Sequence, residues 1–137
     1  MWYALRDLAF GKTDFPVPEV PENIGRPDSG VRKEPRISAP IEQALSMLLN
    51  LLLIEFRAER GFQLSETLLR DPELFQDRRE EAGRAADMVE RIRTDEEIHV
   101  TSLRLYLGEL RSLHFHTEDG GNLLGAEIID PIWAGLV

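Results

Sequence analysis

The sequence predicts an all-α fold built on one long antiparallel helical hairpin. Two stretches, residues 38–70 and 77–116, carry apolar side chains at the three- and four-residue spacing of an amphipathic helix. Asp71-Pro72 separates them, and a proline at that point ends a helix. We find no internal repeat and no alternation of apolar and polar residues that would predict a strand.

The first long helix is expected to begin at Ser38-Ala39-Pro40, where a capping hydroxyl precedes a proline suited to the first turn. The second is expected to begin at Asp77, with Glu80 completing a capping box. The inward stripe of the first contains Ile41, Leu45, Leu48, Leu49, Leu52, Glu55, Phe56, Glu59 and Phe62, and continues toward Leu69. That of the second contains Ala85, Met88, Val89, Ile92, Glu96, His99, Leu103, Tyr106, Leu110 and Leu113.

The segments outside the hairpin are expected to be shorter and less regular. Residues 1–37 form a mostly irregular, proline-rich N-terminal arm, in which residues 2–10 are either a short helix or an apolar plug. Residues 38–137 form the helical domain. A loop is expected after His116, followed by a short amphipathic piece, Leu123 to Ile129, that ends at Asp130-Pro131. The apolar tail (Ile132, Trp133, Leu136 and Val137) is expected to be buried against the domain or a partner.

Composition excludes several classes of function. The formal charge of -9 argues against a nucleic-acid binder, which would carry a basic patch. The absence of cysteine excludes disulfides, thiolate zinc sites and cysteine nucleophiles. The longest apolar stretch, Leu45 to Ile54, is interrupted by polar residues and falls short of the roughly 20 residues that span a bilayer. With no secretory signal at the N-terminus, we expect a soluble cytoplasmic protein with no membrane partner.

The motif Glu96-Glu97-Ile98-His99 carries the clearest chemistry. A Glu-x-x-His pair places a carboxylate and an imidazole on one face of a helix. Helix bundles use this spacing to present an oxygen and a nitrogen ligand to one metal ion. The alternative is an ordinary pair of helix residues, with His99 hydrogen-bonded in a core.

Two further carboxylates, Glu55 and Glu59, fall on the apolar stripe of the first helix. An ionised carboxylate in an apolar interior costs several kcal/mol unless it is neutralised. Neither inward stripe carries Lys or Arg, so a metal ion is one solution and an intersubunit pair with arginine is the other. A turn near residues 74–76 places Glu55 level with Glu96 and Glu59 one turn away. The predicted ligands are therefore Glu55, Glu96 and His99, with Glu59 as the second choice.

This pattern resembles the ferritin-like di-iron carboxylate superfamily, whose bundles draw one Glu from each of two helices and Glu-x-x-His from the other two. The resemblance covers roughly residues 38–116. It is greatest with the small two-helix type, such as encapsulated ferritins, whose site is assembled by pairing two subunits. Glu55 or Glu59 matches the first ligand, while Glu96 and His99 match the second pair. The interval from Glu55 to Glu96, 41 residues, is longer than in the family, and the 37 from Glu59 are closer.

The resemblance implies a ferritin-like four-helix bundle completed by homodimerisation or a higher homo-oligomer. It also implies an oxidoreductase with two irons per site, or manganese or zinc in their place, and with Glu55, Glu96 and His99 as catalytic residues. Such a protein would be a ferroxidase acting on Fe(II), or an oxidase or oxygenase acting on a small molecule, with dioxygen as co-substrate. The alternatives are a non-catalytic helical dimerisation protein and a bundle that binds metal for stability.

Three other side chains were candidates for accessory roles. Tyr106 lies seven residues after His99 on the same predicted face. It is expected to be either a redox-active neighbour of the metal site or an ordinary core residue. His114 and His116 point apart if they lie on a helix and are then surface residues. In an extended segment they would be able to share a metal.

Overall fold

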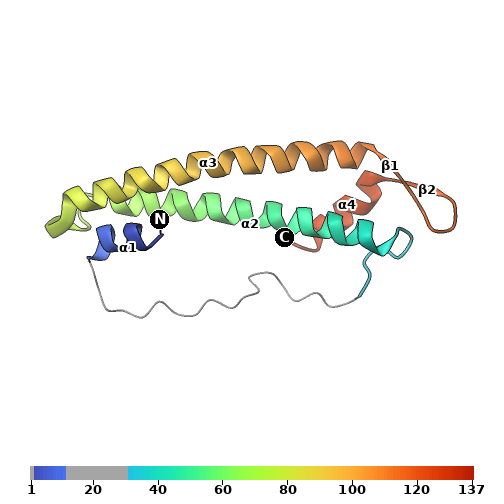
Figure 1. Ribbon diagram of the computed structural model, residues 1–137, viewed down its shortest axis with the longest axis horizontal. Coiled ribbons are helices and arrows are strands. Elements are labelled where there is room, and N and C mark those ends of the chain that lie inside the picture. The colour runs from blue at the N-terminus through green and yellow to red at the C-terminus, as the bar shows by residue number, and fades with distance from the viewer. Residues whose placement is uncertain (1, 12–30) are drawn as a thin grey trace. The chain divides into compact units, whose positions relative to one another are not determined.

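The computed structural model describes residues 2–11 and 31–137, and over these residues the chain is mostly helical (Figure 1). The expected all-α class is therefore confirmed in outline. The helices are α1 (Trp2–Phe10), α2 (Ala39–Arg70), α3 (Arg79–Ser112) and α4 (Gly125–Ala134), with a 3-10 turn at Gln76–Arg78. Two short strands, β1 (His114–His116) and β2 (Asn122–Leu124), lie between α3 and α4. The prolines between residues 12 and 30, on which the expected irregular arm mainly depends, lie outside the described residues.

The two long helices begin and end close to the predicted positions. Helix α2 starts directly after Ser38, whose carbonyl accepts the Glu42 amide at 3.1 Å, and it ends before Asp71-Pro72. Helix α3 starts two residues later than expected, because residues 76–78 form the 3-10 turn. It ends at Ser112 and not at His116, since the chain there leaves the helix to form β1.

The chain divides into two compact units, each of which is described by itself. The first contains residues 57–98 together with α1, and the second contains residues 31–56 and 99–137. Helices α2 and α3 each contribute one part to each unit, and both are continuous through the boundary.

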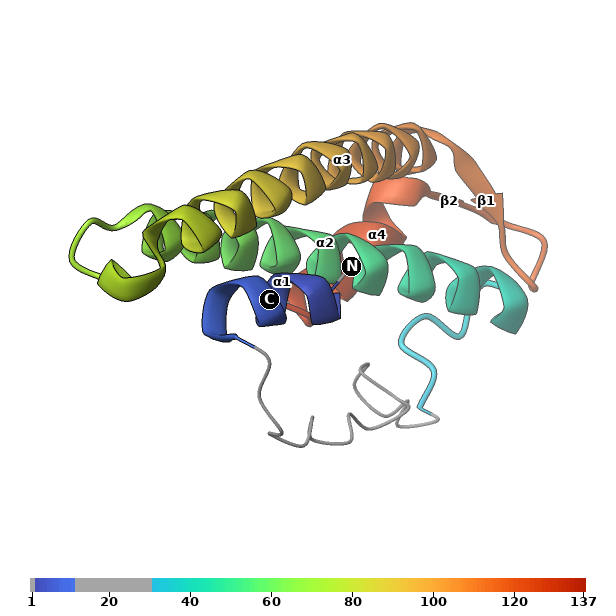
Figure 2. The ribbon, with the colours of Figure 1, turned by 60° about the vertical axis from the view of Figure 1, so that its left-hand side comes forward.

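The core of the first unit is made of small side chains. Its buried residues, none more than 7% exposed, are Ala9, Leu69, Ala82, Ala85, Ala86 and Val89. The alanines allow the helices to approach closely, and α1 contributes Ala9 to this cluster. Figure 2 shows the ribbon of α1 alongside that of α2. The Arg79 guanidinium donates to the carbonyls of Arg70 (2.7 Å) and Asp71, which caps the end of α2.

The core of the second unit contains larger side chains from both long helices and from the C-terminal segment. Its buried residues are Ile37, Leu45, Leu49, Leu52, Val100, Leu103, Leu107, Leu123, Ile128, Ile129, Ile132 and Leu136. Here the buried line of α3 follows Val100, Leu103 and Leu107. The prediction that Tyr106 and Leu113 lie inward was wrong, since they are 55% and 53% exposed. The expected stripe was wrong here because the C-terminal segment joins the cluster on the side of Val100 and Leu107.

The C-terminal segment departs from the sequence prediction in two ways. Strands β1 and β2 pair antiparallel with Phe115 opposite Leu123, although no strand was expected, because three-residue strands are too short to show alternation. Helix α4 continues through Pro131, where an end was predicted. Burial of Ile128, Ile129 and Ile132, each no more than 2% exposed, offsets the roughly 3 kcal/mol that an interior proline costs. Of the tail, Ile132 and Leu136 are buried, whereas Val137 is 76% exposed.

Helix α2 is long and apolar enough to cross a membrane when judged by length and composition alone, and only 22% of its most apolar window is buried. The apolar part of this helix is therefore longer than the stretch Leu45 to Ile54 on which the sequence prediction was based. A single helix of this kind is a weak indication, since core helices of soluble proteins pass the same test. The cytoplasmic location stays a prediction.

Candidate metal centre

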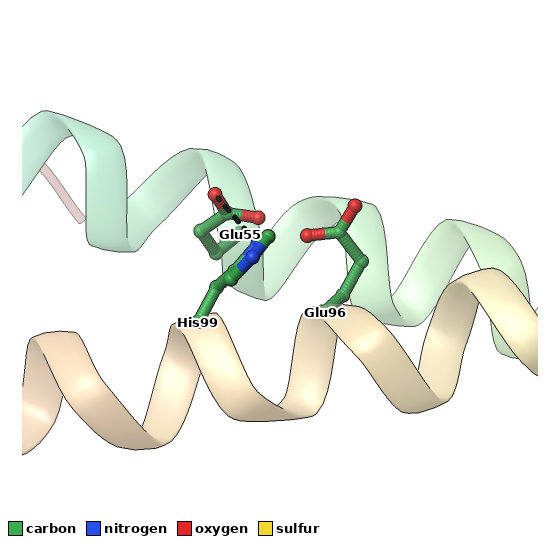
Figure 3. Close-up of side chains that lie close together, drawn as sticks. All are labelled: Glu55, Glu96 and His99. Carbon is green, nitrogen blue, oxygen red and sulfur yellow. Dashed lines mark ion pairs between the residues drawn. The ribbon is translucent and has the colours of Figure 1, made fainter.

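Helices α2 and α3 bring Glu55, Glu96 and His99 together (Figure 3). One ligand atom from each lies within 4.8 Å of the other two. Within the second unit, Nδ1 of His99 lies 3.9 Å from Oε1 of Glu55. The spacing of Glu96 and His99 is fixed by α3, which runs uninterrupted through both residues and so presents them one turn apart on one face.

The three side chains differ in how far they are buried. The Glu55 side chain is only 15% exposed and the His99 side chain is 58% exposed, while Glu96 is half-buried. The expectation that His99 points fully into a core is therefore wrong. It stands on the exposed side of α3 because the buried line passes through Val100 instead. The group consequently has one sheltered carboxylate and one solvent-accessible imidazole.

The donor set fits a first-row transition metal. Carboxylate oxygens and imidazole nitrogens bind such ions at about 2.0–2.2 Å, so ligands on opposite sides of one ion lie roughly 4 Å apart. The 3.9 Å between Glu55 and His99 matches that span, and the upper limit of 4.8 Å for the group exceeds it slightly. Glutamate side chains are long enough to close such a difference by rotamer changes. Two carboxylates with one imidazole suit iron, manganese or zinc, and three protein ligands leave coordination positions open.

Glu59, the second choice for the α2 ligand, is not part of this group. It is half-buried and lies one turn further along α2. Of the two carboxylates left open by the sequence, Glu55 is the one placed beside Glu96 and His99.

Glu66, another carboxylate on α2, is largely buried and is neutralised by arginine side chains. The Glu66 side chain is 18% exposed and pairs with Arg70 at 3.3 Å and with Arg93 at 3.2 Å. Arginine therefore neutralises Glu66 in the first unit. One neighbour of Glu55 is the His99 imidazole, a group that is also able to bind a metal.

The accessory candidates do not join the group. Tyr106 is exposed, which is against both the core role and a sheltered redox role. His114 and His116 lie on β1 and not on a helix, so both point to the exposed face while Phe115 packs on the core of the second unit. Sequence reasoning had left open that an extended segment would bring these two imidazoles to one side.

The sequence matches no protein-family model, no curated protein and no solved structure. The resemblance to ferritin-like proteins therefore depends on the ligand pattern and its geometry.

Proposed function

We propose that this chain binds a transition-metal ion through Glu55, Glu96 and His99 and acts as a di-metal oxidoreductase of the ferritin-like kind. The observation that supports the proposal is the grouping of the three donor atoms within 4.8 Å, contributed by two helices at the positions that the sequence pattern singles out. The motif predicts Glu96 and His99 locally, whereas Glu55 comes from a helix about 40 residues away. An isolated Glu-x-x-His motif would not have a third ligand placed beside it by a helix that is distant in the sequence.

The residues have distinct proposed tasks. Glu55 and Glu96 supply hard oxygen ligands and negative charge, and His99 supplies a nitrogen ligand from the solvent-accessible side. A pair of irons bound there would supply the chemistry of dioxygen reduction, with electrons from Fe(II) itself or from a small organic substrate. The exposed side of His99 gives Fe(II) or a small molecule direct access, and the net charge of -9 attracts cations.

A second copy of the chain completes the proposed site. One chain provides two carboxylates and one imidazole, which is half of the set that di-iron bundles use. A two-fold dimer doubles this to four carboxylates and two imidazoles.

Metal content is the direct test. After anaerobic loading with Fe(II), we expect about two irons per dimer by elemental analysis. Glu96→Gln and His99→Asn should each lower iron affinity at least tenfold, since each removes a ligand. Glu59→Gln and the exposed Glu97→Gln are matched controls that should retain the wild-type iron content. Circular dichroism checks that every variant stays helical.

The outcomes separate the alternatives. A near-ultraviolet absorption that appears only when loaded protein meets dioxygen supports the redox function. Redox-silent zinc or manganese that raises the melting temperature supports a structural metal. Full iron content in Glu96→Gln would refute the proposed ligand set, and metal-free protein of unchanged stability would leave a helical dimerisation module.

A further inference from the structure

Strands β1 and β2 form a hairpin between α3 and α4 (Figure 1), and the two faces of this hairpin differ in exposure. Phe115 and Leu123 lie opposite each other and pack on the core of the second unit, where Leu123 is only 8% exposed. His114 and His116, which flank Phe115, are both exposed. Because successive side chains of a strand point to opposite faces, the two imidazoles share the face that is turned away from the core.

Backbone hydrogen bonds on both sides of β1 hold the two histidines in an extended segment. The Thr117 amide donates to the Gly121 carbonyl at 3.0 Å, and the Gly125 amide donates to the Leu113 carbonyl at 2.7 Å. Both bonds continue the antiparallel register of β1 and β2, so the residues between them are fixed in the ladder. The backbone freedom that a loose loop would have is already lost, and a metal ion that joins the two side chains needs to order little more than the imidazoles.

The spacing of the two histidines suits two ligands of one metal ion. Alternate residues of a strand lie about 6.6 Å apart along its axis. Two nitrogens at adjacent positions around one ion lie roughly 3 Å apart, since each metal–nitrogen bond is about 2.0–2.1 Å long. The imidazole ring reaches well beyond Cβ and its χ2 torsion is soft, so the two rings are able to lean toward each other by this difference. His114 and His116 can therefore chelate an ion without a change in the backbone.

Two imidazole nitrogens favour a different class of metal from the group on α2 and α3. In that group, two of the three donors are the carboxylates of Glu55 and Glu96. Imidazole ligands suit copper, nickel and zinc, and for a given set of ligands the affinity is greatest for Cu²⁺. Mg²⁺ and Ca²⁺ prefer oxygen ligands and would not be held by the hairpin.

Two carboxylates beside the hairpin are engaged in its own hydrogen bonds. Asp119 accepts from the Gly121 amide at 3.2 Å and from the Thr117 hydroxyl, which shapes the turn between the strands. Glu127 accepts from the Leu124 amide at 2.9 Å, which caps the start of α4. These acids stabilise the frame of the hairpin, and the proposed metal ligands are the two imidazoles on its exposed face.

We infer that His114 and His116 together bind one divalent transition-metal ion, Cu²⁺ in preference to Ni²⁺ or Zn²⁺, on the exposed face of the β1–β2 hairpin. Once one imidazole is bound, the second binds in an intramolecular step, which raises the affinity by about 100-fold or more over a single imidazole. The exposure of this face leaves the other coordination positions to water or to a small ligand. The inference does not depend on the proposed function, because the two sites use different residues.

Copper titration of the untagged full chain tests the site in a His99→Asn background, which removes the imidazole of the group on α2 and α3. Isothermal titration calorimetry should show one Cu²⁺ bound per chain, and the electron paramagnetic resonance spectrum should show two coordinated imidazole nitrogens. Adding His114→Asn or His116→Asn should weaken copper binding by about 100-fold or more and leave the signature of at most one nitrogen. Circular dichroism checks that each variant stays helical.

Glu118→Gln is the matched control, because Glu118 is exposed beside β1 and is not a proposed ligand. In the same background it should bind Cu²⁺ as tightly as the unmodified hairpin. Copper affinity that is unchanged by both histidine substitutions overturns the inference. So does a loss in Glu118→Gln as large as the loss in His116→Asn, since the ion would then be held by the acidic turn.

The inference and the proposed function fail separately. The His114→Asn variant of the otherwise wild-type chain keeps Glu55, Glu96 and His99, so its iron content after anaerobic loading should equal that of the wild type. Normal iron loading without copper binding at the hairpin overturns the inference alone. Copper binding at the hairpin in a chain that does not load iron upholds the inference and refutes the proposed function.

Discussion

Gly125→Ala is expected to lower the free energy of unfolding by about 3 kcal/mol, the upper end of the cost of overpacking. A Cβ atom at Gly125 would lie 1.9 Å from the carbonyl oxygen of Leu110 and 2.9 Å from its carbonyl carbon. Both are backbone atoms of α3, so the clash can be relieved only by moving α3 or α4. The Gly125 amide also donates to the Leu113 carbonyl at 2.7 Å, and that movement would break this bond. Urea denaturation followed by circular dichroism measures the change.

Gly108→Ala provides the matched control for this substitution. Gly108 lies in α3 of the same unit, and a Cβ there would meet nothing within 4 Å. Alanine in a helix interior should therefore stabilise the protein by about 0.5–1 kcal/mol. If both variants unfold with the same midpoint as the wild type, the close approach of α4 to α3 is refuted.

The sequence predicted the long elements because their signals are local. Helical spacing, the expected caps at Ser38 and Asp77, and the break at Asp71-Pro72 placed both ends of α2 and the start of α3 within two residues. The requirement for glycine at position 125 is tertiary, since it arises from the Leu110 carbonyl on another helix. For the same reason the persistence of α4 beyond Pro131 was not predictable, because it depends on buried contacts that a single segment does not reveal.

The candidate site likewise combines features that local sequence patterns predict with features that depend on tertiary contacts. The spacing of Glu96 and His99 is a property of one helix, and Glu55 followed from the length of the turn between two helices. The exposure of His99 was missed, since it depends on how the C-terminal segment selects the buried side of α3. A buried acid at Glu42 was also missed, because its partners come from an irregular segment that carries no periodic signal.

Glu42 lies near the start of α2 with its side chain only 8% exposed. Its carboxylate accepts from the Arg32 guanidinium, from the Lys33 amide and from the Glu34 amide, the last at 3.1 Å. Burial raises the pKa of Glu42, but the guanidinium and the two amides together lower it by more, so the pKa lies below its ordinary value of 4.5. The folded protein therefore favours the ionised form.

Glu42→Gln is expected to lower the free energy of unfolding by about 2–3 kcal/mol near pH 7, because it removes a charge on which three donors converge.

The direction of the pH dependence follows from the lowered pKa of Glu42. Its contribution to the free energy of unfolding is complete above the unfolded-state pKa near 4.5, and it is lost as the pH falls through the lower folded-state pKa. Urea denaturation between pH 3 and 7 should thus show a wild-type advantage that is constant above about pH 5 and shrinks below pH 4. The exposed Glu109→Gln is the control and should follow the wild type throughout. A Glu42→Gln deficit that grows on acidification would mean that the carboxyl is held protonated in the fold, which the contacts with Arg32 and the two amides argue against.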